Sequence, residues 1–471
     1  MPAVPVKTLP VKPVAKRVYD VAVLGPDVGG AAAAALCSRR GLRALLCPLA
    51  PVAAARESDG WLIPAAPSIL PPLRQLTGAV GTLDEAGLGT DLQRQGGGPG
   101  SFQILTDRVR LSLPLDPTKR RSELRRELSE AGAAEAEAGL ASLEMLGRGW
   151  DEFLREAPPW PPRGFLEGRR IRKTLPPPPQ LPEGLIGECL YALAPFVTAL
   201  PGDFAPESLA REAAALLRSP LRVFAGEAQL AELLRHKCAA AGGDLIPDVA
   251  AEYVRLEKKG VVFQLGGSEV RASCVVFACS AERIAAMVQE GGRLERKIAE
   301  EAALPVERKI TLAHYVVRPE GLPLALEDAA LVLGNAMGPL LLTNLPARRA
   351  RGESSGEKLL TVARVSDAGF SDAEGLLSSM RAILEPIFPF FDRHVVHQAA
   401  DVNPLQPHPI LRAPEGNDPI GLRPISESNE HVLFASAATY PGFGLEGQIL
   451  AGRAAAGQAL ALSGRKTVSA T

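Results

Sequence analysis

Residues Val21–Pro48, VAVLGPDVGGAAAAALCSRRGLRALLCP, decide the fold of this chain. Apolar periodicity and glycine placement predict a buried parallel strand, a tight turn, a helix and a second strand, over Val21–Leu24, Gly25–Gly30, Ala31–Arg40 and Leu42–Cys47. Gly41 stands where such a helix stops. This order is that of a βαβ unit, the first unit of a doubly wound sheet.

The glycines of this unit follow the dinucleotide-binding pattern G-x-G-x-x-G only in part. Gly25 and Gly30 hold the first and third glycine places, and Gly29 precedes the third, but the middle place is Asp27. The acidic residue expected about 20 positions on, which would bind ribose, is replaced by Pro48. The sequence therefore predicts the fold of a nucleotide-binding domain without two of its usual nucleotide contacts.

Both changes oppose a bound pyrophosphate. The second glycine lets the backbone approach the phosphates, whereas Asp27 adds bulk and a negative charge. Two like charges about 4 Å apart repel by ~4 kcal/mol at an effective dielectric of ~20. Pro48 offers neither an acceptor for ribose hydroxyls nor a backbone donor.

Length and composition narrow the class of protein. The 471 residues exceed one ordinary core, so two intertwined domains are expected. The apolar share of 46% and charged share of 22% are typical of a globular protein, and the net charge of -1 argues against nucleic-acid binding.

Cysteine and histidine are scattered. We expect the six cysteines to be buried, reduced thiols in a cytoplasmic protein, and we expect no metal site. No apolar run reaches the ~18 residues of a membrane span. Residues 1–16 are proline-broken and mildly basic, so we expect a disordered leader and, at most, a peripheral membrane contact through its lysines.

Further segments along the chain carry recognisable patterns. Ser58–Leu70 is expected to form a strand and a proline-rich turn, and Gly96–Gly100 a surface turn. Helices are expected over Lys119–Glu156, Gly184–Leu217, Ala228–Ala240 and Asp372–Pro389. A meander should close on strand Ala272–Ala278, and His431–Leu462 should form a strand, a glycine-rich turn and a long helix.

These blocks, in this order, resemble the phytoene-desaturase and amine-oxidase branch of FAD-dependent oxidoreductases, whose fold Rab GDP-dissociation inhibitors share. The most specific match is Tyr440–Gly447, YPGFGLEG, which is similar to the family's C-terminal flavin turn. The resemblance implies an α/β fold with a discontinuous Rossmann-like FAD-type domain and a second α+β substrate-type domain. The first would comprise residues 17–75, 220–290 and 420–465 and the second residues 76–219 and 291–419, with residues 466–471 as a tail.

The resemblance also implies positions for flavin contacts, and several have lost the family's residue. Asp27 replaces glycine, Pro48 replaces glutamate, and Ala437 replaces the aspartate of a Gly-Asp pair, while residues 49–56 lack the glycines of the family's second turn. The retained positions are Gly25, Gly29, Gly30, Val249, Gly442 and Gly444, of which Val249 would hold adenine through its backbone. No side chain stands out as a catalytic acid or base, although Tyr440 and Phe443 lie in the flavin turn.

The leading functional hypothesis is a flavin-free, non-catalytic relative that binds a protein partner or an apolar ligand such as a lipid or prenyl chain. A cavity lined from Gly184–Leu217 and residues 310–345 would hold that ligand. The alternative is a divergent FAD-dependent oxidoreductase of the carotenoid-desaturase or amine-oxidase type. A nicotinamide-dependent dehydrogenase is disfavoured because Asp27 would oppose that pyrophosphate too.

Overall fold

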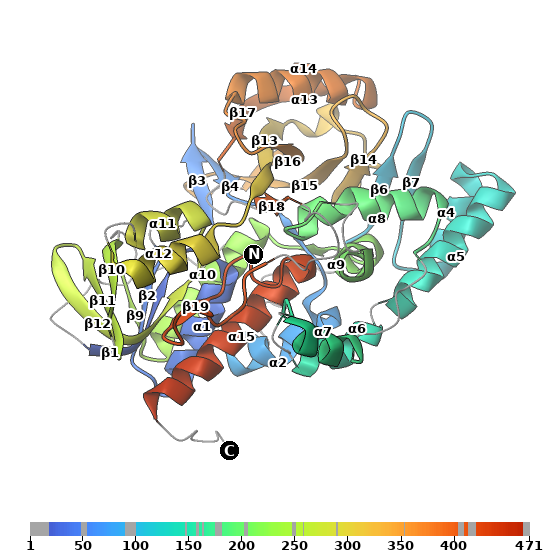
Figure 1. Cartoon of the computed structure of the whole chain (residues 1–471). Helices are drawn as coiled ribbons and strands as arrows, with labels where there is room; N and C mark the ends of the chain where they lie inside the picture. The colour runs from blue at the N-terminus through green and yellow to red at the C-terminus, as the bar shows by residue number, and fades with distance from the viewer. Residues whose placement is uncertain are drawn as a thin grey trace.

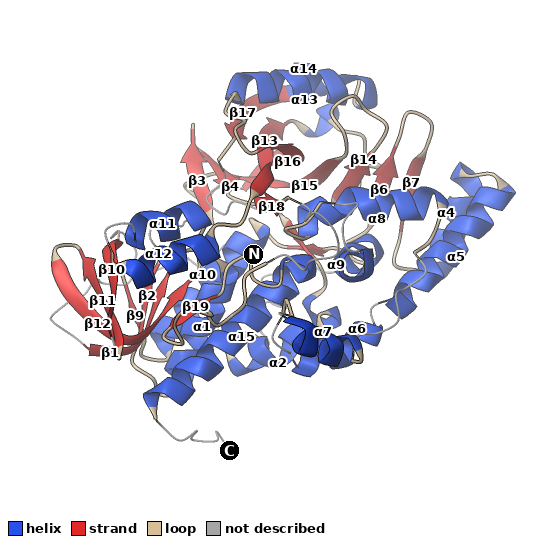
Figure 2. Cartoon of the chain, in the orientation of Figure 1, coloured by secondary structure: helices blue, strands red, loops and turns tan. Residues whose placement is uncertain are grey.

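The computed structural model describes residues 18–48, 54–89, 100–146, 148–156, 160–162, 164–174, 181–201, 206–246, 251–257, 259–288, 291–352, 354–403, 409–412 and 421–464. Two large sheets, each packed against helices, make up the α/β architecture (Figure 1; Figure 2). The predicted fold class, a Rossmann-like sheet accompanied by a second mixed layer, is confirmed.

Segments far apart in the chain form the first sheet. Its strand order is β10-β11-β12-β1-β2-β9, with β19 also paired to β12. The pairs β12·β1, β1·β2, β2·β9 and β12·β19 are parallel, whereas β10, β11 and β12 form the predicted antiparallel meander. The strands are β1 (Val18–Leu24), β2 (Ala44–Cys47), β9 (Asp244–Leu245), β10 (Ala251–Glu257), β11 (Gly260–Leu265), β12 (Ser268–Phe277) and β19 (Val432–Phe434).

Helices bury both faces of this sheet. Apolar side chains of α1 (Val28–Arg39), α10 (Gly226–Ala240) and α15 (Gly444–Ser463) share one core cluster with one face of the strands. Helices α11 (Ala281–Val288) and α12 (Arg293–Ala302) pack on the other face. Parallel strands buried on both sides are apolar throughout, which is why β1 and β2 read as continuous apolar runs.

The second sheet has the order β17-β13-β16-β15-β14-β6-β7, and β18 also pairs with β13. Its pairs are antiparallel except for β14·β6. The strands are β6 (Phe102–Leu105), β7 (Arg110–Leu113), β13 (Val306–Val317), β14 (Ala329–Val332), β15 (Leu340–Arg348), β16 (Ser354–Asp367), β17 (Val395–Asp401) and β18 (Pro409–Leu411).

Helices also cover both faces of the second sheet. One face packs against α5 (Glu130–Leu146), α8 (Gly184–Val197) and α9 (Pro206–Arg218). The other face packs against α13 (Ala373–Ile387) and α14 (Phe391–His394), which lie along the top of Figure 1.

The remaining elements connect the two layers. Three further helices contribute apolar side chains to the α1–α15 core: α2 (Thr77–Glu85), α6 (Arg148–Glu156) and α7 (Gly164–Arg172). The other connecting elements are β3 (Ala55–Ser58), β4 (Trp61–Pro64), β5 (Ile69–Leu70), β8 (Leu221–Arg222), α4 (Pro117–Glu127) and the short 3-10 helices Leu73–Gln75, Pro319–Gly321 and Pro441–Phe443. In sequence, α2 lies between β5 and β6, and α6 and α7 lie between β7 and β8.

One local prediction was wrong. Helix α1 begins at Val28, so the turn after β1 is shorter than predicted and Asp27 is the residue that precedes the helix. Residues 96–99 of the predicted glycine turn lie outside the described residues.

Candidate functional site

The turn between β1 and α1 is shaped by packing within the protein. Gly25 has φ of 135°, and a Cβ there would overlap the carbonyl group of Ala278. A Cβ on Gly30 would overlap the Ala278 side chain, and one on Gly29 would lie against the carbonyl oxygens of Ala435 and Gln448. The three predicted glycine positions therefore let α1 approach β12 and α15, whether or not a ligand is present.

Asp27 turns its carboxyl group across the end of the first sheet. Its Oδ2 accepts a hydrogen bond of 3.2 Å from the backbone amide of Ala437. Burial raises the pKa of Asp27 to about 7; the Ala437 amide opposes this shift, the nearby Glu227 carboxyl adds to it, and Arg283 opposes it. The side chain is partly exposed, so the group remains able to exchange protons with solvent.

This contact joins two of the positions at which the sequence departs from the family. The resemblance implies glycine at 27 and aspartate at 437, whereas this chain has Asp27 and Ala437. The structure brings both residues together across 410 positions of sequence. A carboxyl group is thus present beside the start of α1, but residue 27 carries it and residue 437 does not.

The start of α15 carries a second carboxyl group. Glu212 of α9 accepts hydrogen bonds from the backbone amides of Leu445, at 3.3 Å, and Glu446, at 2.8 Å. Burial raises the pKa of Glu212 well above its ordinary range; the Glu446 amide opposes the shift, and the carboxyl groups of Glu446 and Glu227 add to it. Glu212 therefore fills the anion-binding position that a helix start provides.

The turn that leads into α15 closes around this carboxyl group. Gly442 is buried in the 3-10 turn, and Gly444 has φ of 46°. A Cβ on Gly444 would overlap the carbonyl oxygen of Val197 and the Glu212 carboxyl. Gly444 is thus retained for contacts with α8 and α9 of the second layer.

Arg211 neutralises the neighbouring acid. Its guanidinium pairs with Glu446 at 2.6 Å and with Asp151 at 2.6 Å. The second oxygen of Glu446 accepts the Gly78 amide at 2.7 Å. Arg211 and Glu446 are 5% and 0% exposed, so this charge network lies in the interior between α2, α6, α9 and α15.

Three carboxyl groups, those of Asp27, Glu227 and Glu212, therefore lie in a row between the starts of α1 and α15. The Glu227 carboxyl group raises the pKa of both Asp27 and Glu212, and the Gln448 side chain donates a hydrogen bond of 3.2 Å to Glu227. The cavity beside Glu212 and Glu227, closed by Phe196 and Leu341, has a volume of about 30 Å³.

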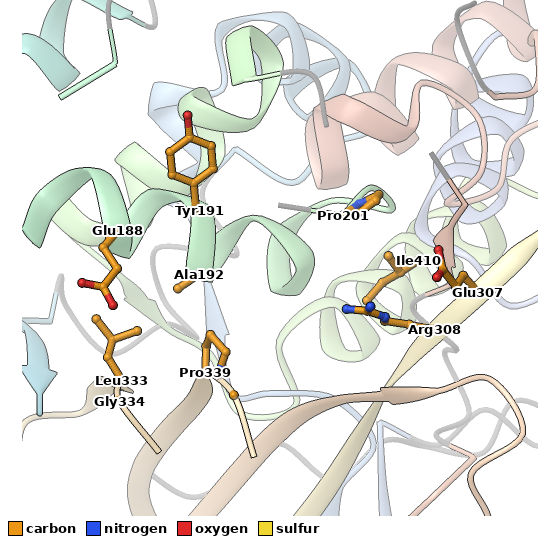
Figure 3. A pocket seen from close by; sticks show the side chains of 11 residues that line it. Glu188, Tyr191, Ala192, Pro201, Glu307, Arg308, Leu333, Gly334, Pro339 and Ile410 are labelled. Carbon is orange, nitrogen blue, oxygen red and sulfur yellow. The ribbon is translucent and has the colours of Figure 1, made fainter. Parts of the chain in front are cut away.

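A larger cavity lies between α8 and the second sheet. Its volume is about 610 Å³, which is within the range of small-molecule sites. Apolar residues Ala192, Pro201, Leu333, Pro339 and Ile410 line it, together with Tyr191, and the charged residues Glu188, Glu307 and Arg308 stand at its wall (Figure 3). Most of these residues come from the two segments, Gly184–Leu217 and 310–345, between which the sequence predicts a cavity.

The other predicted site residues have simpler outcomes. Pro48 is buried directly after β2, and Val249 lies outside the described residues. Sequence reasoning missed Glu212, Glu227 and Arg211. The adjacent Arg211 and Glu212 interrupt the apolar face of α9, ahead of a run of Ala and Leu, and this is the signal that could have revealed them.

Other chemistry-bearing groups form no additional site in the part of the chain that the structure describes. All six cysteines are free and buried, as predicted. No group of three His, Cys, Asp or Glu side chains could hold a metal ion among the described residues. No described helix is long and apolar enough to cross a membrane.

Comparison with known proteins shows the fold. The sequence matches no protein-family model and no curated protein. A triple mutant of putrescine oxidase aligns with a TM-score of 0.56 at 13% identity, covering 94% of this chain and 99% of that one. An Exiguobacterium protein provisionally assigned as a protoporphyrinogen oxidase gives 0.55 at 14%, with the same coverage. An oxidoreductase from Methanosarcina mazei gives 0.54 at 13%, covering 92% and 99%.

These matches confirm the resemblance at the level of architecture. The chain has the fold of FAD-dependent amine oxidases and protoporphyrinogen oxidases over nearly its whole length. At such identities the likeness concerns the fold alone.

Proposed function

We propose that this chain is a flavin-free relative of the FAD-dependent oxidases that acts by binding an apolar ligand, or a protein partner, rather than by redox catalysis. The observation that supports this most is the self-filling of the cofactor region. Asp27 and Glu212 place carboxyl groups near the starts of α1 and α15, where the family's fold would present backbone amides to a cofactor.

Electrostatics and space both support this proposal. A dinucleotide would bring negative phosphates toward Asp27, and like charges about 4 Å apart repel by ~4 kcal/mol at an effective dielectric of ~20. Protonation of Asp27, whose pKa is about 7, would relieve the repulsion at lower pH but would leave the bulk of the side chain. Glu212 and the cavity of about 30 Å³ beside it would exclude the ring end of the cofactor at any pH.

The cavity of about 610 Å³ is the place for an apolar ligand. Its wall combines Glu188, Tyr191 and Ala192 of α8 with the loop between β14 and β15, and Tyr191 is 46% exposed. Charged side chains are confined to Glu188, Glu307 and Arg308, so the lining suits an aliphatic or isoprenoid chain better than a multiply charged metabolite.

The alternative function is a divergent FAD-dependent oxidoreductase, and the shared fold favours it. The aligned putrescine oxidase structures include one with putrescine bound, at 15% identity and a TM-score of 0.53. For this chain, catalysis would require the row of carboxyl groups to rearrange around the cofactor, because Glu212 holds the amides of Leu445 and Glu446.

A spectrum of the native protein separates the two functions. The full chain, purified without added cofactor, is examined by visible absorbance and by mass spectrometry of the molecules it releases on denaturation. A colourless protein that releases an apolar molecule supports the proposal. A yellow protein that releases FAD in stoichiometric amount and oxidises an amine or an isoprenoid would overturn it.

A further inference from the structure

Helix α7 is fixed to the body of the protein on one side. Ile171 is 2% exposed and belongs to the α1–α15 core. Glu167 forms a two-pronged ion pair with Arg423, at 3.0 and 3.2 Å. These contacts set which face of α7 points outward.

The outward face combines two apolar side chains with cations. Phe165 and Leu166 are 80% and 79% exposed, and Arg169 and Arg170 are exposed one turn further on. At about 100° per residue these four fall within an arc of about 140°, while Glu167 and Ile171 fall on the opposite side. Lys173, in the turn that follows, is exposed as well.

The exposed apolar residues of α7 are adjacent to each other and are not scattered singly over the surface. Single exposed apolar residues are common, but two adjacent large ones exposed nearly completely mark a contact surface. The chain as a whole has a net charge of -1, so the cations of this face are a local concentration. The one acidic residue of α7, Glu167, is engaged by Arg423 and does not neutralise them.

We propose that the outward face of α7, defined by Phe165, Leu166, Arg169, Arg170 and Lys173, docks on an anionic lipid surface. Phe165 and Leu166 enter the boundary between headgroups and acyl chains, and the cations lie at the level of the lipid phosphates. An apolar pair flanked by cations suits this boundary, whereas a nucleic acid would leave the pair exposed to water. Figure 1 shows α7 in the lower half of the view, away from α13 and α14.

Vesicle flotation with the full chain tests this surface. Vesicles of phosphatidylcholine alone are compared with vesicles that also contain phosphatidylglycerol, for the native protein and two double variants. We expect binding to the anionic vesicles only. Arg169→Gln with Arg170→Gln should weaken that binding about 30-fold, since each cation near an anionic surface contributes roughly a factor of five. Phe165→Ser with Leu166→Ser should weaken it at least tenfold.

Matched controls separate this face from a general effect of charge or hydrophobicity. Lys119→Gln with Arg125→Gln removes two exposed cations from α4, and Leu324→Ser with Phe390→Ser removes two exposed apolar side chains elsewhere. Both controls should bind anionic vesicles as the native protein does. The proposal is overturned if the native protein ignores anionic vesicles, if the α7 variants bind like the controls, or if α7 captures polyglutamate or RNA but no vesicle.

Discussion

At the scale of single residues, Asp27 gives the stability of this protein an unusual dependence on pH. Its folded-state pKa of about 7 is above the value of ~3.9 expected in the unfolded chain. The folded state therefore binds this proton more tightly, and the Asp27 contribution to stability falls as pH rises from ~4 to ~7.

Asp27→Asn should remove this dependence. Asparagine keeps an oxygen for the Ala437 amide but has no charge to bury. We expect the variant to unfold at higher urea than the native protein at pH 8, by about 1–3 kcal/mol after allowance for partial exposure, and at similar urea near pH 4. Urea titrations at both pH values measure the difference.

Asp116→Asn serves as the control of opposite sign. Its carboxylate accepts the Thr118 and Lys119 amides at the start of α4, and these hydrogen bonds hold its pKa below the ordinary value. That variant should be less stable than the native protein above pH ~4, by an amount that no longer changes between about pH 5 and pH 8, because a lowered pKa contributes its stability fully above the unfolded value. An Asp27→Asn effect of equal size at pH 4 and pH 8 would contradict the raised pKa of Asp27.

Arg211 is the second residue whose removal should be costly. Arg211→Met leaves Glu446, which is 0% exposed, without its cation, and breaking a buried pair costs about 3–5 kcal/mol. Adding Glu446→Gln removes the stranded charge and should restore most of that loss. A double-mutant cycle by urea unfolding measures the coupling, and additive effects of the two substitutions would contradict the buried pair.

At the scale of elements, the crossing of α1 and α15 depends on glycine. A Cβ on Gly29 would lie against two carbonyl oxygens, and one on Gly452 would lie against the Gly29 carbonyl. Close approach of the two helices positions both of their starts near the carboxyl row. The glycine pattern of the dinucleotide fingerprint thus serves here to pack one helix on another.

Gly452→Ala should destabilise the protein by about 1–3 kcal/mol because the helices would have to separate. Gly457→Ala, one and a half turns further along α15, is the matched control because a Cβ there meets open space. The control should gain about 0.5–1 kcal/mol from the helix preference of alanine. Thermal unfolding of both variants measures the contrast, and equal shifts would show that the helices do not meet at Gly452.

The sequence allowed many elements to be predicted but not their cross-chain contacts. The β1–α1–β2 unit, the β10–β12 meander and α15 follow from apolar runs and glycine breaks. The β3–β4 hairpin was missed although Asp59-Gly60 is a hairpin turn signal. The Asp27–Ala437 and Glu212–Leu445 contacts join residues 410 and 233 positions apart, and no local pattern specifies such pairs.

At the scale of the whole molecule, two cavities of very different volume bear on the two candidate functions. The cavity beside Glu212 and Glu227 has a volume of about 30 Å³, whereas the cavity between α8 and the second sheet has a volume of about 610 Å³. The fold could be predicted from the order of blocks in the sequence. The hydrogen bonds of Glu212 and Glu227 with residues at the start of α15 could not, because these side chains come from α9 and α10 and meet α15 only in three dimensions.

Filling the larger cavity should weaken ligand binding. Ala192 lies in its wall on α8, so Ala192→Trp should weaken binding of a fluorescent fatty acid at least tenfold. Ala134→Trp on the exposed surface of α5 is the control and should bind as the native protein does. Fluorescence titration reports both, and equal affinities for the two variants would place the ligand elsewhere.

A titration of the full chain with FAD tests whether the native protein binds the flavin. The native protein is compared with the variant Asp27→Gly, Pro48→Glu, Ala437→Asp, and with the same variant carrying Glu212→Ala. We predict no saturable binding to the native protein, measurable binding of the ADP portion once the first three positions are restored, and binding of whole FAD only when Glu212 is also removed. Tight, stoichiometric binding of FAD by the native protein would contradict the account.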